Sequence, residues 1–338
     1  MNIGIVNDMD MATQAIRATL DSNHEHRVLW TANSGPEAVR LCRQSPPDLV
    51  LMDLVMPGMN GAQATREIMR SSPTAILVVT ASVNHNCGLA FEAMGAGALD
   101  VITTPSLASN AGRHEFLQKL AQMAAIITDH QQSAAPPACQ PNSLACGAPG
   151  ATDTLVAIGC SAGGPAALAE ILTALAPVNQ AAVVIIQHID ARFIDDLARW
   201  LKDFSKDPLQ LVTEGDQLQA GRIFLAGKDG HLEAHACARL RYNPNLGGLA
   251  YQPSVDVFFA SIARHWKGRA LGIILTGMGR DGAAGLQAMR DAGFLTIAQN
   301  EASSALFGMP KAAAPFAAEI LPLASIAARI NQWIQSSQ

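Results

Sequence analysis

The chain has 338 residues, 49% of them hydrophobic, which is too long for one typical domain and predicts two, each with its own core. Its formal net charge of −5 provides no overall attraction for phosphate backbones or anionic lipids, so nucleic acid is not expected as a partner. Six cysteines without metal-site spacing, no secretory leader pattern and no membrane-spanning apolar run predict a reduced, cytoplasmic protein without membrane insertion.

The first third of the chain alternates short apolar runs with helical patterns. Strands that are covered on both faces read as continuous apolar runs, and five strand–helix units in series are typical of a parallel sheet with helices on both sides. We therefore predict an α/β domain with a five-stranded parallel sheet. The predicted strands are 2–7, 28–32, 48–53, 75–81 and 98–104, and the predicted helices are 11–20, 35–44, 61–69, 88–97 and 114–128.

Polar side chains gather where these strands end, and the residues concerned are Asn7, Asp8, Asp53, Thr80 and Thr104. In open α/β sheets, ligands bind at the carboxyl ends of the strands. A carboxylate such as Asp53 can attack phosphorus there, while a second acid holds the Mg²⁺ that offsets the charge of a transferring phosphoryl group. Asp53 alone would be explained by the "MPGMNG" turn that follows it, but the full set of strand ends favours phosphoryl chemistry.

Residues 1 to about 127 resemble a response-regulator receiver domain, and "DLVLMDLVMPGMNG" is similar to its phosphorylation-site stretch. The resemblance implies a flavodoxin-like fold with Asp53 as the phospho-acceptor. It also implies a Mg²⁺ site formed by Asp8, Asp53 and the carbonyl of Val55, with Thr80 as the switch hydroxyl that closes on the phosphoryl group.

Two positions depart from the receiver pattern. Asn7 stands where receivers usually carry a second acid, so one negative charge is missing from the metal site. Thr104 stands before Pro105, where receivers usually carry a lysine that pairs with the phosphoryl group, and it offers a hydroxyl without a charge. We therefore expect weaker Mg²⁺ binding or weaker coupling of phosphorylation to output.

The segment from 129 to 153 is rich in Pro, Ala, Ser, Gln and Gly and has no hydrophobic period, which is typical of a linker. It predicts a receiver-like domain at 1–127, a flexible linker at 128–152 and a second domain at 153–338. In the second domain the alternation resumes with longer connections, which predicts a doubly wound α/β fold. The predicted strands are 154–159, 181–189, 209–214, 221–226, 270–277 and 294–299, and the predicted helices are 165–175, 193–204, 255–266 and 282–292.

Ser161 lies in "GCSAG", a G-x-S-x-G pattern between a predicted strand and a predicted helix. Small neighbours allow a sharp turn there that exposes a nucleophilic hydroxyl, and the N–H groups at the helix start can stabilise an oxyanion. The simpler interpretation is a serine N-cap, which would be favoured for an isolated Ser-x-Gly-Gly. A dinucleotide-binding turn fits less well, because serine replaces the middle glycine of G-x-G-x-x-G.

A nucleophilic serine needs a base and an acid that orients the base. His188 ends the predicted strand "VVIIQHI", and Asp281 follows a glycine-rich turn at the start of a helix. Each has a simpler interpretation, a buried histidine and a helix N-cap, but three such residues at strand ends of one sheet favour a triad. Cys160 is an alternative nucleophile, although its place at the end of an apolar strand is more typical of a small buried side chain.

These segments, with "GRIFLAGKDGHL" and "QPSVDVFFASIA", resemble the catalytic domain of the CheB family of chemotaxis-type protein-glutamate methylesterases. The resemblance implies Ser161 as nucleophile, His188 as general base and Asp281 as the orienting acid, with the backbone N–H of Met278 at the oxyanion. Family members often have Thr where this chain has Ala162. The Asn7-Asp8 pair and Thr104 are also similar to the Wsp-type branch of the family.

The CheB resemblance further implies a phosphorylation-regulated serine hydrolase. Its substrates would be glutamate methyl esters on the cytoplasmic helices of a chemoreceptor, with receptor glutamines as further substrates for deamidation. A CheA-type histidine kinase would be the phosphodonor, Mg²⁺ would serve only the receiver, and ester hydrolysis would need no cofactor. The alternative is a receiver-coupled binding or output protein without catalysis, which would lack a complete triad.

Overall fold

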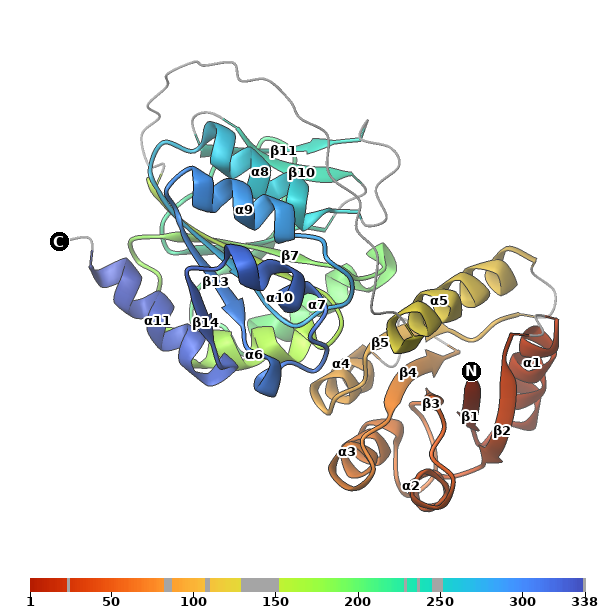
Figure 1. Cartoon of the computed structure of the whole chain (residues 1–338). Coiled ribbons are helices and arrows are strands. Elements are labelled where there is room, and N and C mark those ends of the chain that lie inside the picture. The colour runs from red at the N-terminus through yellow and green to blue at the C-terminus, as the bar shows by residue number, and fades with distance from the viewer. Residues whose placement is uncertain are drawn as a thin grey trace. The chain divides into compact units, whose positions relative to one another are not determined.

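The computed structural model describes residues 1–22, 25–81, 87–106, 110–128, 152–227, 230–235, 238–244 and 252–336. The chain divides into two compact units, Met1–Gln132 and Ser133–Gln338. The division falls inside the predicted linker, of which residues 129–151 lie outside the described part of the chain. Each unit has its own sheet and is described separately below (Figure 1).

The first unit is a five-stranded parallel sheet in the order β2-β1-β3-β4-β5. Helices α1 and α5 contact each other on one face, while α2, α3 and α4 form a contacting row on the other. The elements are β1 (Asn2–Val6), α1 (Asp10–Asp21), β2 (Arg27–Ala32), α2 (Gly35–Gln44), β3 (Leu49–Asp53), α3 (Gly61–Ser71), β4 (Ala75–Thr80), α4 (Cys87–Gly95), β5 (Asp100–Thr103) and α5 (Asn110–Thr128).

The second unit is built on a seven-stranded sheet in the order β14-β13-β12-β6-β7-β9-β8, with a separate hairpin of β10 and β11. Helices α8 and α9 cover one face of the sheet, and α6, α7 and α11 cover the other (Figure 1). The elements are β6 (Thr154–Cys160), α6 (Gly164–Ala174), β7 (Ala182–Gln187), α7 (Ile194–Lys202), β8 (Leu209–Leu211), β9 (Arg222–Leu225), β10 (His231–His235), β11 (Arg239–Asn243), α8 (Val255–His265), β12 (Arg269–Ile274), α9 (Ala283–Asp291), β13 (Leu295–Gln299), α10 (Met309–Ala313), β14 (Glu319–Leu321) and α11 (Leu323–Gln335).

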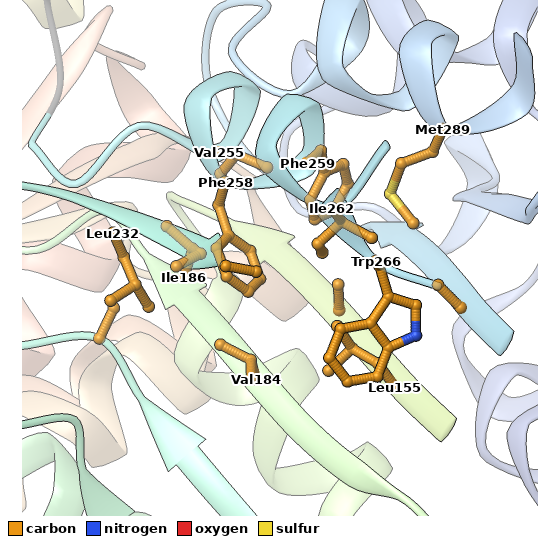
Figure 2. Close-up of a cluster of buried hydrophobic side chains, with 14 of the residues drawn as sticks. Leu155, Val184, Ile186, Leu232, Val255, Phe258, Phe259, Ile262, Trp266 and Met289 are labelled. Carbon is orange, nitrogen blue, oxygen red and sulfur yellow. The ribbon is translucent and has the colours of Figure 1, made fainter. Parts of the chain in front are cut away.

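Helix α8 anchors the core of the second unit. Phe258 and Ile262, on one face of the helix, and Trp266, just past its end, point toward the strands that carry Leu155 and Val184 (Figure 2). The two phenylalanines of α8, Phe258 and Phe259, are completely buried. Burial of this apolar face stabilises α8 against the sheet and thereby holds the start of the helix in place at the sheet edge.

Each predicted strand and helix of the first unit corresponds to an observed element, with ends that differ by a few residues. In the second unit, the β10–β11 hairpin, strand β14 and helices α10 and α11 were not predicted. The hairpin strands "HLEAH" and "RLRYN" are short and polar, so they lack the apolar runs on which strand prediction depends. Helix α11 does bury Ile326, Ile330 and Trp333 on one side, so its pattern was available in the sequence.

Candidate active site and candidate phosphorylation site

The candidate active site lies at the point in the second sheet where the chain changes the side on which it adds strands. After β6 the chain adds β7, β9 and β8 on one side, and then returns to add β12, β13 and β14 on the other. The carboxyl ends of β6 and β12 therefore flank a topological switch point, the usual position of a ligand site in an open α/β sheet. Ser161 follows β6, His188 follows β7, and the loop that leads to Asp281 follows β12.

Ser161 occupies a tight turn between β6 and α6. Its N–H donates to the carbonyl of Thr276 (3.1 Å), and its own carbonyl accepts from the N–H of Gly164 (2.8 Å). Gly163 has φ of 74°, a conformation that favours glycine, and Pro165 stands in the first turn of α6. A Cβ on Gly164 would lie 2.1 Å from the side-chain oxygen of Gln187. Gly163, the last residue of the G-x-S-x-G stretch, is therefore required by its backbone conformation, and Gly164, just after the stretch, by close packing at the turn.

His188 is brought beside Ser161 by strand register. Cys160 pairs with Gln187 in the parallel ladder of β6 and β7, so Ser161 and His188 occupy the next positions on neighbouring strands. The N–H of His188 donates to the carbonyl of Cys160 (3.0 Å), which continues that ladder. Neighbouring strands lie about 4.8 Å apart. Both side chains belong to largely buried residues, with Ser161 7% exposed and His188 8% exposed.

Asp281 completes the group. Its Oδ2 lies 2.8 Å from Nε2 of His188, and it also accepts the N–H of Val255 (2.7 Å). Its Oδ1 accepts the hydroxyl of Ser254 (2.7 Å) and the N–H of Asp256 (3.0 Å). Burial by itself would raise the pKa of Asp281, but the hydrogen bond and charge of His188 and the donors at α8 outweigh it and lower the pKa below its ordinary value. Asp281 is thus an anion that orients the imidazole.

The loop after β12 is clamped against the serine turn. The N–H of Gly277 donates to Leu306 (3.1 Å), and its carbonyl accepts the N–H groups of Gly308 (3.1 Å) and Met309 (2.9 Å). A Cβ on Gly277 would come within 2.9 Å of Cβ of Ser161. The next N–H, that of half-buried Met278, donates to no acceptor among the described residues. A donor so placed beside the serine turn has the character of an oxyanion site.

Buried amides that were not singled out in the sequence hold these turns together. Gln187 donates from Nε2 to the carbonyls of Ser161 (2.8 Å) and His188 (2.9 Å), and its Oε1 accepts from the thiol of Cys160 (3.0 Å). On the other side, Oε1 of Gln299 accepts the N–H of Thr276 (2.7 Å). Each glutamine is the last residue of a buried strand, so a polar residue closing an apolar run was the available signal.

Cys160 does not have the properties of a nucleophile. Its side chain is fully buried, and burial raises the pKa of its thiol well above the ordinary value. A thiol is nucleophilic only as the thiolate, which this environment disfavours. Its bond to Gln187 gives it a packing role beside the serine turn.

In the first unit, the predicted phosphorylation residues come together at one edge of the sheet. Asp53 ends β3, Thr80 ends β4, and Thr104 follows β5, with its N–H donating to the carbonyl of Thr80 (2.9 Å). Asp53 is half-buried, and burial raises its pKa to about 6. The charge of Asp8 contributes to this raised pKa, while the N–H groups of Leu54 and Val55 oppose the rise. The two carboxyls are therefore close enough to interact.

The donors at this edge fit a hard cation. Mg²⁺ is commonly held by one or two carboxylates and retains several waters. Asp8 and Val55 are exposed, and Asp53 provides the second carboxylate. The side-chain oxygen of Asn7 already accepts the N–H of Met9 (2.8 Å), so it adds no charge and is engaged within the loop. Among the described residues, no three His, Cys, Asp or Glu side chains form a cluster suited to a metal.

Comparison with known families assigns both units. The profile of the CheB methylesterase family matches residues 156–330, and that of the response regulator receiver domain matches residues 3–111. The α/β fold predicted from the sequence, a five-stranded receiver sheet followed by a catalytic domain of the CheB type, is confirmed by these matches. The resemblance to a Wsp-type branch stays a prediction. No helix in the described residues has the length and apolar character needed to cross a membrane.

Similar proteins cover the whole chain. A protein of Burkholderia thailandensis named protein-glutamate methylesterase/protein-glutamine glutaminase 4 is 48% identical over 343 residues, which cover 100% of this chain and 99% of that protein. A Cupriavidus metallidurans protein named protein-glutamate methylesterase/protein-glutamine glutaminase 2 is 46% identical and covers 98% of this chain and 97% of its own length. The crystal structure of the Thermotoga maritima CheB methylesterase catalytic domain is 28% identical with a TM-score of 0.51, covering 53% of this chain and 97% of that domain.

Proposed function

The chain belongs to the CheB methylesterase family, and on that premise we propose that it hydrolyses glutamate methyl esters on the signalling helices of a chemoreceptor. The observation that carries the proposal is the hydrogen bond between Nε2 of His188 and Oδ2 of Asp281 (2.8 Å), with His188 following the strand next to the Ser161 turn. A serine beside an oriented imidazole is the arrangement that acyl transfer requires. The compartment that suits such a substrate is the cytoplasm.

The contacts support a separate role for each side chain. Nε2 of His188 is bound to Asp281, so Nδ1 is the ring nitrogen that takes the proton of the Ser161 hydroxyl. Oγ of Ser161 attacks the ester carbonyl, and the N–H of Met278 stabilises the resulting oxyanion. His188 returns the proton to the leaving methoxide, which departs as methanol. Water, deprotonated by the same nitrogen, then releases the glutamate and the free serine.

The same residues would hydrolyse a side-chain amide. The relatives from Burkholderia and Cupriavidus are both named glutaminases as well as methylesterases. In that reaction the acyl-enzyme on Ser161 is identical, and ammonia leaves in place of methanol after protonation by His188. We therefore include deamidation of receptor glutamines in the proposed activity.

The first unit would control this activity through phosphorylation. We propose Asp53 as the phospho-acceptor, Thr80 and Thr104 as the hydroxyls beside it, and a CheA-type histidine kinase as phosphodonor. Asp8, Asp53 and the carbonyl of Val55 would hold Mg²⁺, which offsets charge on the transferring phosphoryl group. A receiver coupled to a non-catalytic output module is disfavoured, because the His188–Asp281 pair is kept in a hydrogen-bonded arrangement.

Methanol release from a methylated receptor signalling fragment tests the proposal. The wild type should release methanol, Ser161→Ala should not, and Ser325→Ala, an exposed serine on α11, should match the wild type. Equal release by Ser161→Ala and wild type would contradict the assigned nucleophile. No release by the wild type on a verified methylated substrate would contradict the esterase function itself.

A further inference from the structure

The start of α8 and the start of α9 hold each other through two aspartates. Asp281, just before α9, accepts the N–H groups of Val255 and Asp256 in the first turn of α8. In return, Oδ1 of Asp256 accepts the N–H of Gly285 in the first turn of α9 (2.6 Å). The N–H of Gly282 also donates to Asp256. Asp281 therefore caps α8, the helix that contains Asp256, and Asp256 caps α9, the helix that follows Asp281.

The packing of α8 on α9 is close enough to require a glycine. A Cβ on Gly285 would lie 2.8 Å from the carbonyl oxygen of Asp256 and 2.7 Å from Cβ of Phe259. Since unpaired N–H groups carry partial positive charge at a helix start, each carboxyl also lies in a favourable field. The position of Asp281, and through it that of His188, is thus set by the contact of two helices.

The two carboxyls also hydrogen-bond to each other. Two such groups side by side in a buried setting cannot easily both be ionised, so they share a proton. Burial and, next, the charge of Asp281 raise the pKa of Asp256 to about 7, against the opposing N–H groups of Gly285 and Gly282. The pKa of Asp281 is lowered, so below about pH 7 the shared proton lies on Asp256.

In the part of the second unit that the structure describes, few other titratable groups lie around the pair. His188 bonds to Asp281 from β7, and His231 at the start of β10 accepts the N–H of Ser254 through Nδ1 (3.2 Å). Arg280, next to Asp281 in the chain, is exposed. Arg264 and His265 stand in the last turn of α8, at the opposite end of the helix from Asp256.

We propose that Asp256 is a positioning residue for the reaction, which caps α9 and donates its proton to Asp281 so that Asp281 remains anionic and directed at His188. The proposal rests on the proposed esterase function. Asp256 acts only through Asp281, so it should affect turnover and leave substrate binding unchanged. Its ionisation would remove the donor and place a second negative charge beside Asp281, which should weaken the helix contact.

Two substitutions distinguish the effect of the Asp256 proton from the effect of losing the hydrogen bonds that hold the two helices. Asp256→Asn keeps an acceptor for Gly285 and supplies a donor to Asp281, so at pH 6 its kcat should stay within about twofold of the wild type. Asp256→Ala removes both bonds, and its kcat should fall about tenfold or more with KM unchanged. The wild-type kcat should decline on the alkaline side of a step near pH 7, the pKa of Asp256, and Asp256→Asn should lack that step.

Unfolding of the full chain by urea provides a readout that is independent of catalysis. Because the pKa of Asp256 is raised in the folded state, its protonated form contributes stability. This contribution is fully present below about pH 4 and is lost as pH rises to about 7. The stability of Asp256→Asn relative to the wild type should therefore increase from pH 4 to pH 7 and then level off. A constant difference between the two proteins, or a wild-type pH step retained in Asp256→Asn, would overturn the proposal. An inactive wild type would contradict the esterase function and leave the unfolding test in force.

Discussion

Asp281 keeps its negative charge although it is almost fully buried. Besides the carboxyl of Asp256, four donors surround its two oxygens: the imidazole of His188, the hydroxyl of Ser254 and two N–H groups at the start of α8. Hydrogen bonds to the charged form lower the pKa of a carboxyl and offset the cost of burial. Asp281 therefore enters catalysis already ionised and aligned.

Asp281→Asn should lower kcat for methanol release by about 10⁴-fold, the loss typical when an amide stabilises the wrong tautomer of the catalytic histidine. The lowered pKa of Asp281 also means that its charge stabilises the fold above about pH 4 and that this stability is lost as pH falls. Acid unfolding of wild type and Asp281→Asn should reveal the difference. A variant with wild-type kcat would contradict the orienting role.

Cys160 and Ser161 are neighbours, so their roles can be separated by a thiol reagent. Cys160→Ala should keep most of the methylesterase activity, because the thiol is buried and its pKa is raised. Alkylation by iodoacetamide in native buffer should leave wild-type turnover unchanged over the time in which exposed cysteines react. Inactivation that Cys160→Ala prevents would point to the thiol as nucleophile.

Asp53 has a pKa near 6 because it is partly buried beside Asp8. A carboxyl attacks phosphorus only when ionised, so phosphorylation by a small acyl phosphate should slow as pH falls through this value. Mg²⁺ should move the Asp53 titration to lower pH, since a bound cation favours the charged form. Carbon-13 NMR of the carboxyl, assigned with Asp53→Asn, measures both effects. A titration midpoint unaffected by Mg²⁺ would contradict the metal site.

At the scale of elements, the site depends on turns that approach too closely for side chains. Gly277→Ala would push Cβ against the Ser161 turn and against the sulfur of Met309, which lies 2.4 Å from the added atom. Met278, the proposed oxyanion donor, is the next residue, so a shift of the loop moves its N–H. We expect kcat to fall about tenfold or more, because displacements near 1 Å at a reacting group are costly.

Gly95→Ala in α4 is the control for this substitution, because a Cβ there meets no atom within 4 Å. It should leave activity unchanged and, in a helix, slightly raise stability. Methanol release and thermal unfolding compare the two variants. Full activity in Gly277→Ala would show that the contact between the loop after β12 and the serine turn is not needed.

Apolar periodicity was sufficient to locate every strand of the first sheet and all strands of the second except β14, because burial on two faces leaves continuous apolar runs such as 154–160. It did not reveal the β10–β11 hairpin, whose strands are short and rich in polar residues and of which β10 packs against α8. Strand order was also not available from the chain. The position of β12 beside β6, which brings Asp281 to His188, depends on long-range pairing.

The candidate site was predictable where a polar side chain follows the end of an apolar strand or the turn after it. Ser161, His188 and Asp281 carried that signal, and the structure places His188 against Asp281. Gln187 and Asp256 were not singled out, because their functions follow from contacts between elements. A buried glutamine or a second acid in a helix has an ordinary interpretation until its partners are known.

At the level of the whole molecule, one chain joins a receiver domain to a methylesterase domain of the CheB family. Asp53→Asn should abolish stimulation of methanol release by a phosphodonor with Mg²⁺, while the unstimulated rate stays near that of the wild type. Thr104→Lys should increase stimulation, because lysine supplies the charge missing beside the phosphoryl group. Stimulation of Asp53→Asn equal to the wild type would contradict control through this residue.

Ser161 is proposed as the nucleophile of a hydrolase, and covalent labelling of its hydroxyl tests that role. The full chain would be treated with a fluorophosphonate, which transfers a phosphonyl group to an activated serine with loss of fluoride, and the adduct mapped by peptide mass spectrometry. We expect one adduct on Ser161, absent in His188→Ala, with loss of methanol release in proportion to labelling. Complete labelling of Ser161 without loss of activity, or inactivation by an adduct on Cys160, would contradict it.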